Sequence, residues 1–194
     1  YRMPAMILSD GLIGQMMEKV ELFDQVPRAA EFDQSWVTTG KTPDRERNII
    51  TSLDLDSYAM EKHNLHLQEK YRKLSDNEVR YELIDCDNID YLLVAYGSSA
   101  RICQKAVKLA REKGIRLGLL RPITLFPFPT ESIAKIATRV KGILSVELSA
   151  GQMIEDVRLA VGDKVPARHF GRMGGVIHSP EEVLEALEAS FINK

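Results

Sequence analysis

The sequence is poor in cysteine, in long apolar runs and in charge of one sign. Its two cysteines, Cys86 and Cys103, form no C-x-x-C pair, so neither a disulfide framework nor a thiolate metal site is indicated, and a reducing cytoplasm is the expected location. No apolar run approaches the roughly 20 residues that a transmembrane helix needs. With 26 basic and 28 acidic side chains, the chain is nearly neutral, which argues against binding to nucleic acid or to a membrane surface.

Recognisable catalytic motifs are absent as well. Gly97-Ser98-Ser99 fits neither a G-x-G-x-x-G fingerprint nor a Walker A loop, so no nucleotide site is indicated. No Ser/His/Asp arrangement, carboxylate pair at helical spacing or metal-binding cluster stands out. His63 and His66 could reach one face of a helix, but no third ligand is near, so we expect both to face solvent. The sequence therefore predicts no catalytic residue and no metal ligand.

What the sequence does contain is a regular alternation of short apolar runs and amphipathic stretches. The apolar runs predict strands at residues 91–96, 115–120, 143–147 and 165–170, and residues 78–85 alternate well enough for an edge strand. Between the strands, apolar side chains recur at helical spacing. Because strand–helix–strand crossovers of this length need a parallel sheet, residues 79–194 are predicted to form an α/β domain, three-layered and doubly wound around a mostly parallel five-stranded sheet.

The part before this domain is less regular. Residues 4–9 read as one apolar strand that cannot bury its own faces, so residues 1–20 are interpreted as the end of a preceding domain. The chain starts with Tyr-Arg-Met-Pro, without an initiator Met or a signal peptide, and we expect it to be a piece of a longer polypeptide. Residues 21–78 are predicted to be a linker followed by a helix at 57–74, for which Ser57 is the expected cap.

Two loops are the candidates for a ligand site. In open parallel sheets, ligands bind beyond the carboxyl ends of strands that send their helices to opposite faces. Gly97, Ser98 and Ser99, with Arg101 close behind, follow one strand, and another is followed by Ser149, Gly151 and Gln152. Each loop delivers small residues to a helix start, where free N–H groups favour an anion. The alternative is that the serines only cap the helices.

Other residues are candidates for contacts with a partner. The segment 119–129 carries Phe126 and Phe128, which pack either under the sheet edge or on another subunit. In the linker, Phe23, Phe32, Trp36 and Val37 are too apolar for a flexible spacer and are expected to lie on a protein surface. The loop at 167–180 combines glycines with Arg168, His169, Arg172 and His178, and is either a simple turn or a basic loop on an anionic ligand or acidic partner.

Taken together, these segments resemble the alpha subunit of 2-oxoacid:ferredoxin oxidoreductases, closest to the 2-ketoisovalerate and 2-oxoglutarate types. The matching stretches are YGSSAR, GLLRPITLFPFP, VELSAGQM and GRMGG, together with an upstream EKYRKL. PAMILSDGLIGQMME at the start resembles the end of the family's pyrimidine-binding domain. The resemblance covers nearly the whole chain.

The resemblance implies a domain like the C-terminal domain of transketolase, with strand order 1-3-2-4-5 and the first strand antiparallel. It also places the two serine loops at the switch point, where we expect a packing seam covered by GRMGG. The complete enzymes of the family use thiamine diphosphate with Mg²⁺, iron–sulfur clusters and CoA to convert a 2-oxoacid into an acyl-CoA, passing electrons to ferredoxin. Implied partners are a thiamine-binding beta subunit and iron–sulfur gamma and delta subunits.

The chain departs from the family's catalytic pattern, which needs Gly-Asp-Gly and a downstream Asn. Ser9 stands where the first Gly should be, the nearest Asn is Asn48, and cluster cysteines are missing. The chain is therefore interpreted as a non-catalytic assembly domain that binds no cofactor and is inactive alone. The alternatives are a domain that binds an anionic ligand or a regulator, and the equivalent domain of a 2-oxoacid dehydrogenase or transketolase.

Overall fold

The computed structural model describes residues 1–17, 19–22 and 33–193. It separates into two compact units, one made of Tyr1–Met16 with Tyr71–Lys194 and the other of Met17–Lys70. In the part of the chain that the structure describes, no helix combines the length and the apolar character required to cross a membrane. The domain boundaries expected from the sequence stay a prediction.

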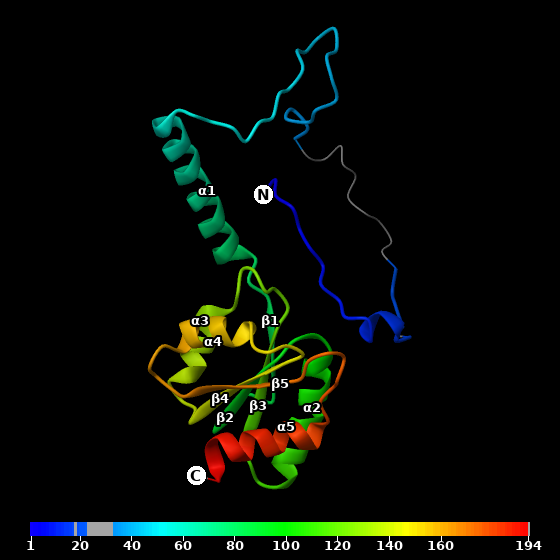
Figure 1. Cartoon of the computed structure of the whole chain (residues 1–194), viewed down its shortest axis with the longest axis vertical. Helices are drawn as coiled ribbons and strands as arrows, with labels where there is room; N and C mark the ends of the chain where they lie inside the picture. Colours follow the sequence, from blue (N-terminus) through cyan, green and yellow to red (C-terminus); the bar gives the residue numbers. More distant parts are fainter. Residues whose placement is uncertain (18, 23–32, 194) are drawn as a thin grey trace. The chain divides into compact units, whose positions relative to one another are not determined.

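The first unit is built on a five-stranded sheet with the order β1-β3-β2-β4-β5 (Figure 1). Its strands are β1 (Tyr81–Ile84), β2 (Tyr91–Val94), β3 (Leu117–Pro122), β4 (Gly142–Glu147) and β5 (Ala167–Gly171). β1 runs antiparallel to β3, and every other neighbouring pair is parallel. The α/β class and the strand order expected from the resemblance are both confirmed.

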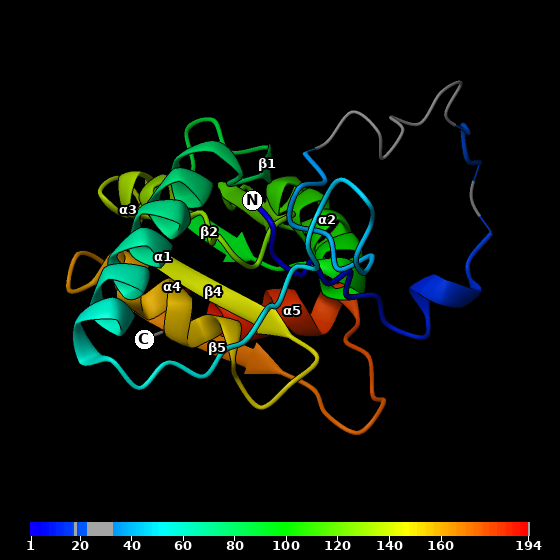
Figure 2. The same cartoon turned by 90° about the horizontal axis from the view of Figure 1, so that it is seen from above.

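Helices cover both faces of this sheet (Figures 1 and 2). On one face, α3 (Thr130–Ala137) and α4 (Met153–Val161) enclose a core that includes Leu92 and Val94. On the other, α2 (Gly97–Glu112) and α5 (Pro180–Leu187) enclose a core that includes Leu93. Because alternate residues of β2 feed opposite cores, the strand reads as an unbroken apolar run, as is typical of parallel sheets.

A capping box and close ring packing determine the structure of the last part of the chain. α5 begins at a capping box in which the Ser179 hydroxyl accepts from the N–H of Glu182 (3.1 Å) and the Glu182 carboxylate accepts from the N–H of Ser179 (2.8 Å). A short π-helix, η3 (Glu188–Ile192), follows and brings Phe191 onto Tyr91 of β2, with ring centroids 5.8 Å apart. A Cβ on Gly142 would meet the Phe191 ring at 2.6 Å, so a larger residue at the start of β4 would have to displace this ring.

In the second unit, the linker is held by local side-chain bonds. The Arg45 guanidinium donates to the carbonyl of Val37 (3.2 Å) and the hydroxyl of Thr39 (2.7 Å), and Asn48 also donates to Val37 (3.2 Å). The charged stretch around Arg45 thus organises this loop. Trp36 is 38% exposed, while Phe23 and Phe32 lie outside the described residues.

The predicted helix is α1 (Ser57–Asn77), which begins in the second unit and ends in the first. Its cap is not Ser57, as the sequence suggested, but Asp56. The Asp56 carboxylate accepts from the N–H groups of Tyr58 and Ala59, both at 2.9 Å, which satisfies two of the free donors of the first turn. His63 and His66 are both exposed on this helix, as predicted.

Candidate functional site

The strands β2 and β4 are neighbours, and their helices go to opposite faces of the sheet. β2 leads into α2 and β4 leads into α4, so this is the switch point of the fold. The loops that follow the two strands meet in a crevice of about 320 Å³. Its lining includes Gly97, Ser98 and Ser99 at the start of α2 and Ser149 and Gln152 from the loop after β4. The structure therefore brings both predicted loops to one place.

A third segment closes this crevice. Leu8, Ser9, Asp10 and Ile13 line it from the N-terminal part of the chain. The GRMGG segment, which was expected to cover the crevice, is not part of the lining. It packs instead against the loop after β4, where the N–H of Arg172 donates to the carbonyl of Glu147 (3.1 Å). A Cβ on Gly171 would clash with the carbonyl oxygen of Ser149, so only glycine allows this close approach.

The start of α4 already holds a carboxylate, that of the buried Glu147. One oxygen accepts from the Ser145 hydroxyl (2.8 Å) and the N–H of Ile154 (2.9 Å). The other accepts from the Ser149 hydroxyl (3.0 Å) and from the N–H groups of Gln152 (2.9 Å) and Met153 (3.0 Å). Because the positive end of a helix favours an anion, this side chain supplies from inside the chain the charge that was expected from a ligand.

The hydrogen bonds also decide the charge of Glu147. Burial is the largest single influence and by itself would raise the pKa of this carboxyl. The hydrogen bonds from Gln152, Ser145, Met153 and Ser149 together outweigh burial and hold the pKa below the ordinary value. The side chain is therefore ionised at neutral pH. His169 approaches the same group, with its Nε2 3.9 Å from a carboxylate oxygen of Glu147, which is too far for a hydrogen bond.

The start of α2 is held in the same manner by Asp10. One carboxylate oxygen accepts from the Ser98 hydroxyl at 2.7 Å, and the other accepts from the N–H of Ile13 at 2.7 Å. These bonds, that from Ile13 first and that from Ser98 next, lower the pKa of Asp10. Ser98 and Ser149 were expected either to cap their helices or to help to hold an anion. Instead, both hydroxyls donate to carboxylates of the chain itself.

Ser99 and His178 form a second buried contact near the crevice. The Ser99 hydroxyl lies 3.5 Å from Nε2 of His178, at the limit of a hydrogen bond. The His178 ring packs on Phe170, with centroids 5.2 Å apart, and burial lowers the pKa of the imidazole, which is therefore neutral at pH 7. Both side chains are almost fully buried, and we interpret the pair as a packing contact between α2 and the glycine-rich loop.

The remaining predicted site residues are dispersed. Arg101 is exposed and does not line the crevice; its guanidinium lies 3.8 Å from the Met16 sulfur. Arg172 is paired with Glu182, and Arg168 is exposed on β5. Of the two phenylalanines, Phe128 packs against the core beneath α3 and α4, whereas Phe126 stays 63% exposed and touches Tyr71 edge-on at 6.3 Å between centroids.

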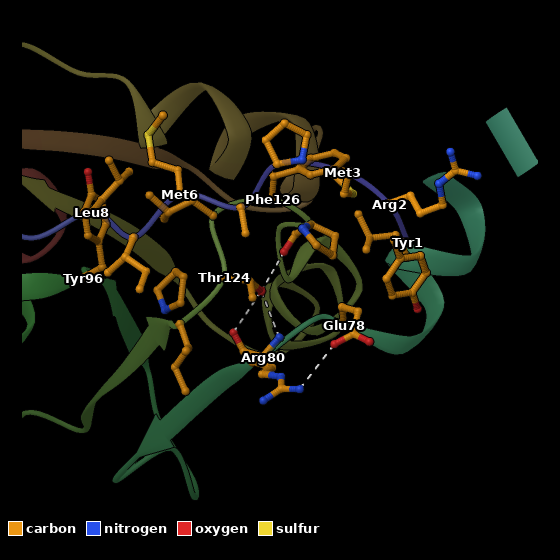
Figure 3. A pocket seen from close by; sticks show the side chains of 18 residues that line it. Tyr1, Arg2, Met3, Met6, Leu8, Glu78, Arg80, Tyr96, Thr124 and Phe126 are labelled. Carbon is orange, nitrogen blue, oxygen red and sulfur yellow. Dashed lines mark hydrogen bonds and ion pairs between the residues drawn. The ribbon is translucent and has the colours of Figure 1, made fainter. Parts of the chain in front are cut away.

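A larger groove, of about 790 Å³, lies between residues 1–8 and the loop at 122–127 (Figure 3). Several of its polar groups are joined to one another. The Thr124 hydroxyl accepts from the N–H of Arg80 (2.9 Å) and donates to the carbonyl of Pro127 (2.8 Å), and the Arg80 guanidinium pairs with Glu78 (3.3 Å). The surface of this groove is mostly apolar.

Comparisons with known proteins support the resemblance seen in the sequence. The sequence profile of the pyruvate:ferredoxin oxidoreductase core domain II matches residues 89–183. The ketoisovalerate oxidoreductase subunit VorB of Methanothermobacter thermautotrophicus is 41% identical over 187 residues, which make up 96% of this chain and 52% of that protein. The 2-oxoglutarate synthase subunit KorA of Methanothermobacter marburgensis is 28% identical over 211 residues, 96% of this chain and 56% of that protein. The chain thus spans about half the length of these relatives.

Two solved structures share the fold. A 2-oxoglutarate:ferredoxin oxidoreductase from Magnetococcus marinus, with 2-oxoglutarate, coenzyme A and succinyl-CoA bound, superposes with a TM-score of 0.66 at 18% identity, covering 76% of this chain and 27% of that one. A split-gene transketolase, in its inactive beta4 tetramer, gives a TM-score of 0.50 at 16% identity, covering 57% of this chain and 40% of that one. At these identities, the likeness concerns the fold alone.

Proposed function

Since the chain belongs to the 2-oxoacid:ferredoxin oxidoreductase family, we propose that it is the C-terminal assembly domain of the alpha subunit of such an enzyme. The complete enzyme would convert a 2-oxoacid and CoA into an acyl-CoA and CO₂ and pass the electrons to ferredoxin. The observation that carries this proposal is the 41% identity with a ketoisovalerate oxidoreductase subunit along 96% of the chain. The greater similarity to this subunit than to the 2-oxoglutarate synthase subunit, at 28%, favours 2-ketoisovalerate as the substrate.

The assembly role is supported by the state of the switch-point crevice. Its two helix starts are occupied by the carboxylates of Glu147 and Asp10, and each of these carboxylates is satisfied by donors of the chain itself. An incoming anion would meet negative charge at both positions, which disfavours the alternative of a domain that binds an anionic ligand. The proposed role of the domain is to present surface to its neighbours, and Phe126 and Met173, 63% and 60% exposed, are suited to it.

The residues present do not fit the cofactors of the family. A thiamine diphosphate–Mg²⁺ site needs available oxygen ligands, but the Asp10 carboxylate is engaged by Ser98 and Ile13, and the described residues include no group of three His, Cys, Asp or Glu side chains that could hold a metal ion. An iron–sulfur cluster needs thiolates, whereas Cys86 and Cys103 are buried and burial raises the pKa of both thiols. We assign these cofactors and the CoA site to other parts of the enzyme and to partner subunits.

The proposal is tested with the full-length protein, purified together with its partner subunits. The ratio kcat/KM is measured for 2-ketoisovalerate, 2-oxoglutarate and pyruvate, with CoA and ferredoxin present. We expect the highest value with 2-ketoisovalerate. A higher value with 2-oxoglutarate would contradict the proposed substrate, and no oxidation of any 2-oxoacid would contradict the proposed activity. The alternative, that the chain is the equivalent domain of a transketolase, predicts a reaction that does not depend on CoA. A reaction that needs no CoA would therefore favour that alternative.

A further inference from the structure

The helices α2 and α5 lie next to each other on one face of the sheet and cover the same core (Figures 1 and 2). Near their starts, the Ser99 hydroxyl of α2 lies 3.5 Å from Nε2 of His178, two residues before α5. Near their ends, the Lys113 ammonium lies 3.7 Å from the Glu188 carboxylate. Because both pairs of ends are close, the two helices run in the same general direction and share one outer surface.

This outer surface carries opposite charges on its two helices. A basic stripe on α2 consists of Arg101, Lys105 and Lys108, and an acidic stripe on α5 and the start of η3 consists of Glu181, Glu185 and Glu188. In each stripe the charges stand at positions i, i+4 and i+7, which share one face of a helix. The two stripes therefore have the same length, the same spacing and opposite sign.

Neither stripe stabilises the helix that carries it. Like charges four residues apart, such as Arg101 and Lys105, or Glu181 and Glu185, repel each other. Glu185 also lies in the last turn of α5, where the helix dipole disfavours an acid and no basic residue is present. The exposed charges at positions 105, 108, 181 and 185 form no ion pair within the described part of the chain. Opposite charges supplied from outside the chain would offset these repulsions.

A second copy of the chain carries the charges that both stripes lack. If a two-fold axis runs between α2 and α5 along their common direction, α2 of each copy lies on α5 of the other. The equal spacing then sets Lys105 against Glu185 of the second copy, and Lys108 against its Glu188. A two-fold axis across the helices would instead bring each stripe onto its own like, which is repulsive.

We propose that the outer surface of α2 and α5 is a contact between two copies of this subunit, with the basic stripe of each copy on the acidic stripe of the other. The half-buried Ile102, Leu109 and Ala186 on the same helices add apolar surface, as is found at the centre of interfaces. The inference goes beyond the proposed function, because it concerns pairing of the subunit and holds whatever reaction the complete enzyme performs.

Two charge reversals, Lys105→Glu and Glu185→Lys, test the contact. Each variant alone sets like charges against each other at both symmetry-related contacts, so the dissociation constant of its dimer should rise by about tenfold or more. In an equimolar mixture, the introduced acid of one variant meets the introduced base of the other, and the second contact keeps the native pair. We therefore expect the mixture to associate about as tightly as the native chain. Sedimentation equilibrium of the 194-residue chain at low ionic strength measures all three dissociation constants.

Lys135→Glu is the matched control, because it reverses an exposed lysine on α3, on the other face of the sheet. It should leave the dissociation constant unchanged. A native chain that stays monomeric at every concentration would overturn the proposal, and so would a dimer that neither reversal weakens. A mixture that associates no better than the single variants would also overturn it. Circular dichroism checks the fold of each variant, and Lys108→Glu replaces Lys105→Glu if the latter does not fold.

Discussion

Replacement of Glu147 by glutamine should destabilise the domain far more than its small change in shape suggests. The native carboxylate accepts five hydrogen bonds, three of them from main-chain N–H groups at the start of α4. Glutamine keeps one acceptor oxygen and places an NH₂ group where the other stood. In its better orientation, the NH₂ group faces the Ser145 hydroxyl and the N–H of Ile154. The hydroxyl can rotate and accept a hydrogen bond from the NH₂ group, whereas the N–H of Ile154 is left without an acceptor.

The magnitude follows from these contacts. One buried N–H left without an acceptor costs about 1–3 kcal/mol. The three remaining bonds lose their charge assistance, which is the difference between about 1.5–3 and about 0.5–1.5 kcal/mol for each bond. Because such terms are not additive, we expect a total loss of about 3–5 kcal/mol in the free energy of unfolding. This is a large part of the roughly 5–15 kcal/mol that stabilises a typical domain.

Urea unfolding followed by circular dichroism measures this loss. The matched control is Glu155→Gln, which removes an exposed acid from the first turn of the same helix and should cost no more than about 1 kcal/mol. If Glu147→Gln and Glu155→Gln shifted the free energy of unfolding by the same small amount, the carboxylate of Glu147 would not be what holds the start of α4.

Three further changes follow from the same structure. The pKa of Glu147 is lowered on folding, so its contribution to stability is complete above its unfolded-state pKa of about 4.3. This contribution is lost as the pH falls through the lower folded pKa. On the acid side, the free energy of unfolding should therefore change less with pH in Glu147→Gln than in the native protein. Gly171→Ala should cost about 1–3 kcal/mol in the free energy of unfolding, because the new Cβ clashes with the main-chain oxygen of Ser149. A Cβ at Gly14 meets nothing within 4 Å, so Gly14→Ala should be nearly neutral, and thermal unfolding compares the two variants. Leu93→Ala, at a fully buried position, should cost about 2–5 kcal/mol in urea unfolding.

The fold could be predicted from the sequence because its signals are local and repeated. Each central strand is buried on both faces, so that β2 and β4 appear as short apolar runs, and the helices between them show an apolar stripe. The strand order had no such signal and came from the resemblance to a family. The local sequence also predicted Ser57 as the cap of α1. This was wrong by one residue, because the carboxylate of Asp56 caps the first turn.

The candidate site could be predicted only in part. The two loops were predicted because they follow strands of the parallel sheet. The carboxylates of Asp10 and Glu147, which occupy the two helix starts, were not predicted. Asp10 reaches Ser98 across 88 residues, and no local pattern reports a contact over such a separation. Glu147 did leave a signal, since an acidic residue at the end of a buried strand, just before a helix start, is placed to cap that helix. Arg101 was a candidate residue of the first loop, but it does not line the crevice and its guanidinium lies near the Met16 sulfur.

The central claim is that this chain is an assembly domain and that the chemistry lies elsewhere in the enzyme. The most direct test is the amount of acyl-CoA formed from 2-ketoisovalerate and CoA, with thiamine diphosphate, Mg²⁺ and an electron acceptor present. It is measured for the 194-residue chain alone and for the full-length protein with its partner subunits. We expect acyl-CoA from the complete enzyme and none from the chain alone. Acyl-CoA formed by the chain alone would contradict the account.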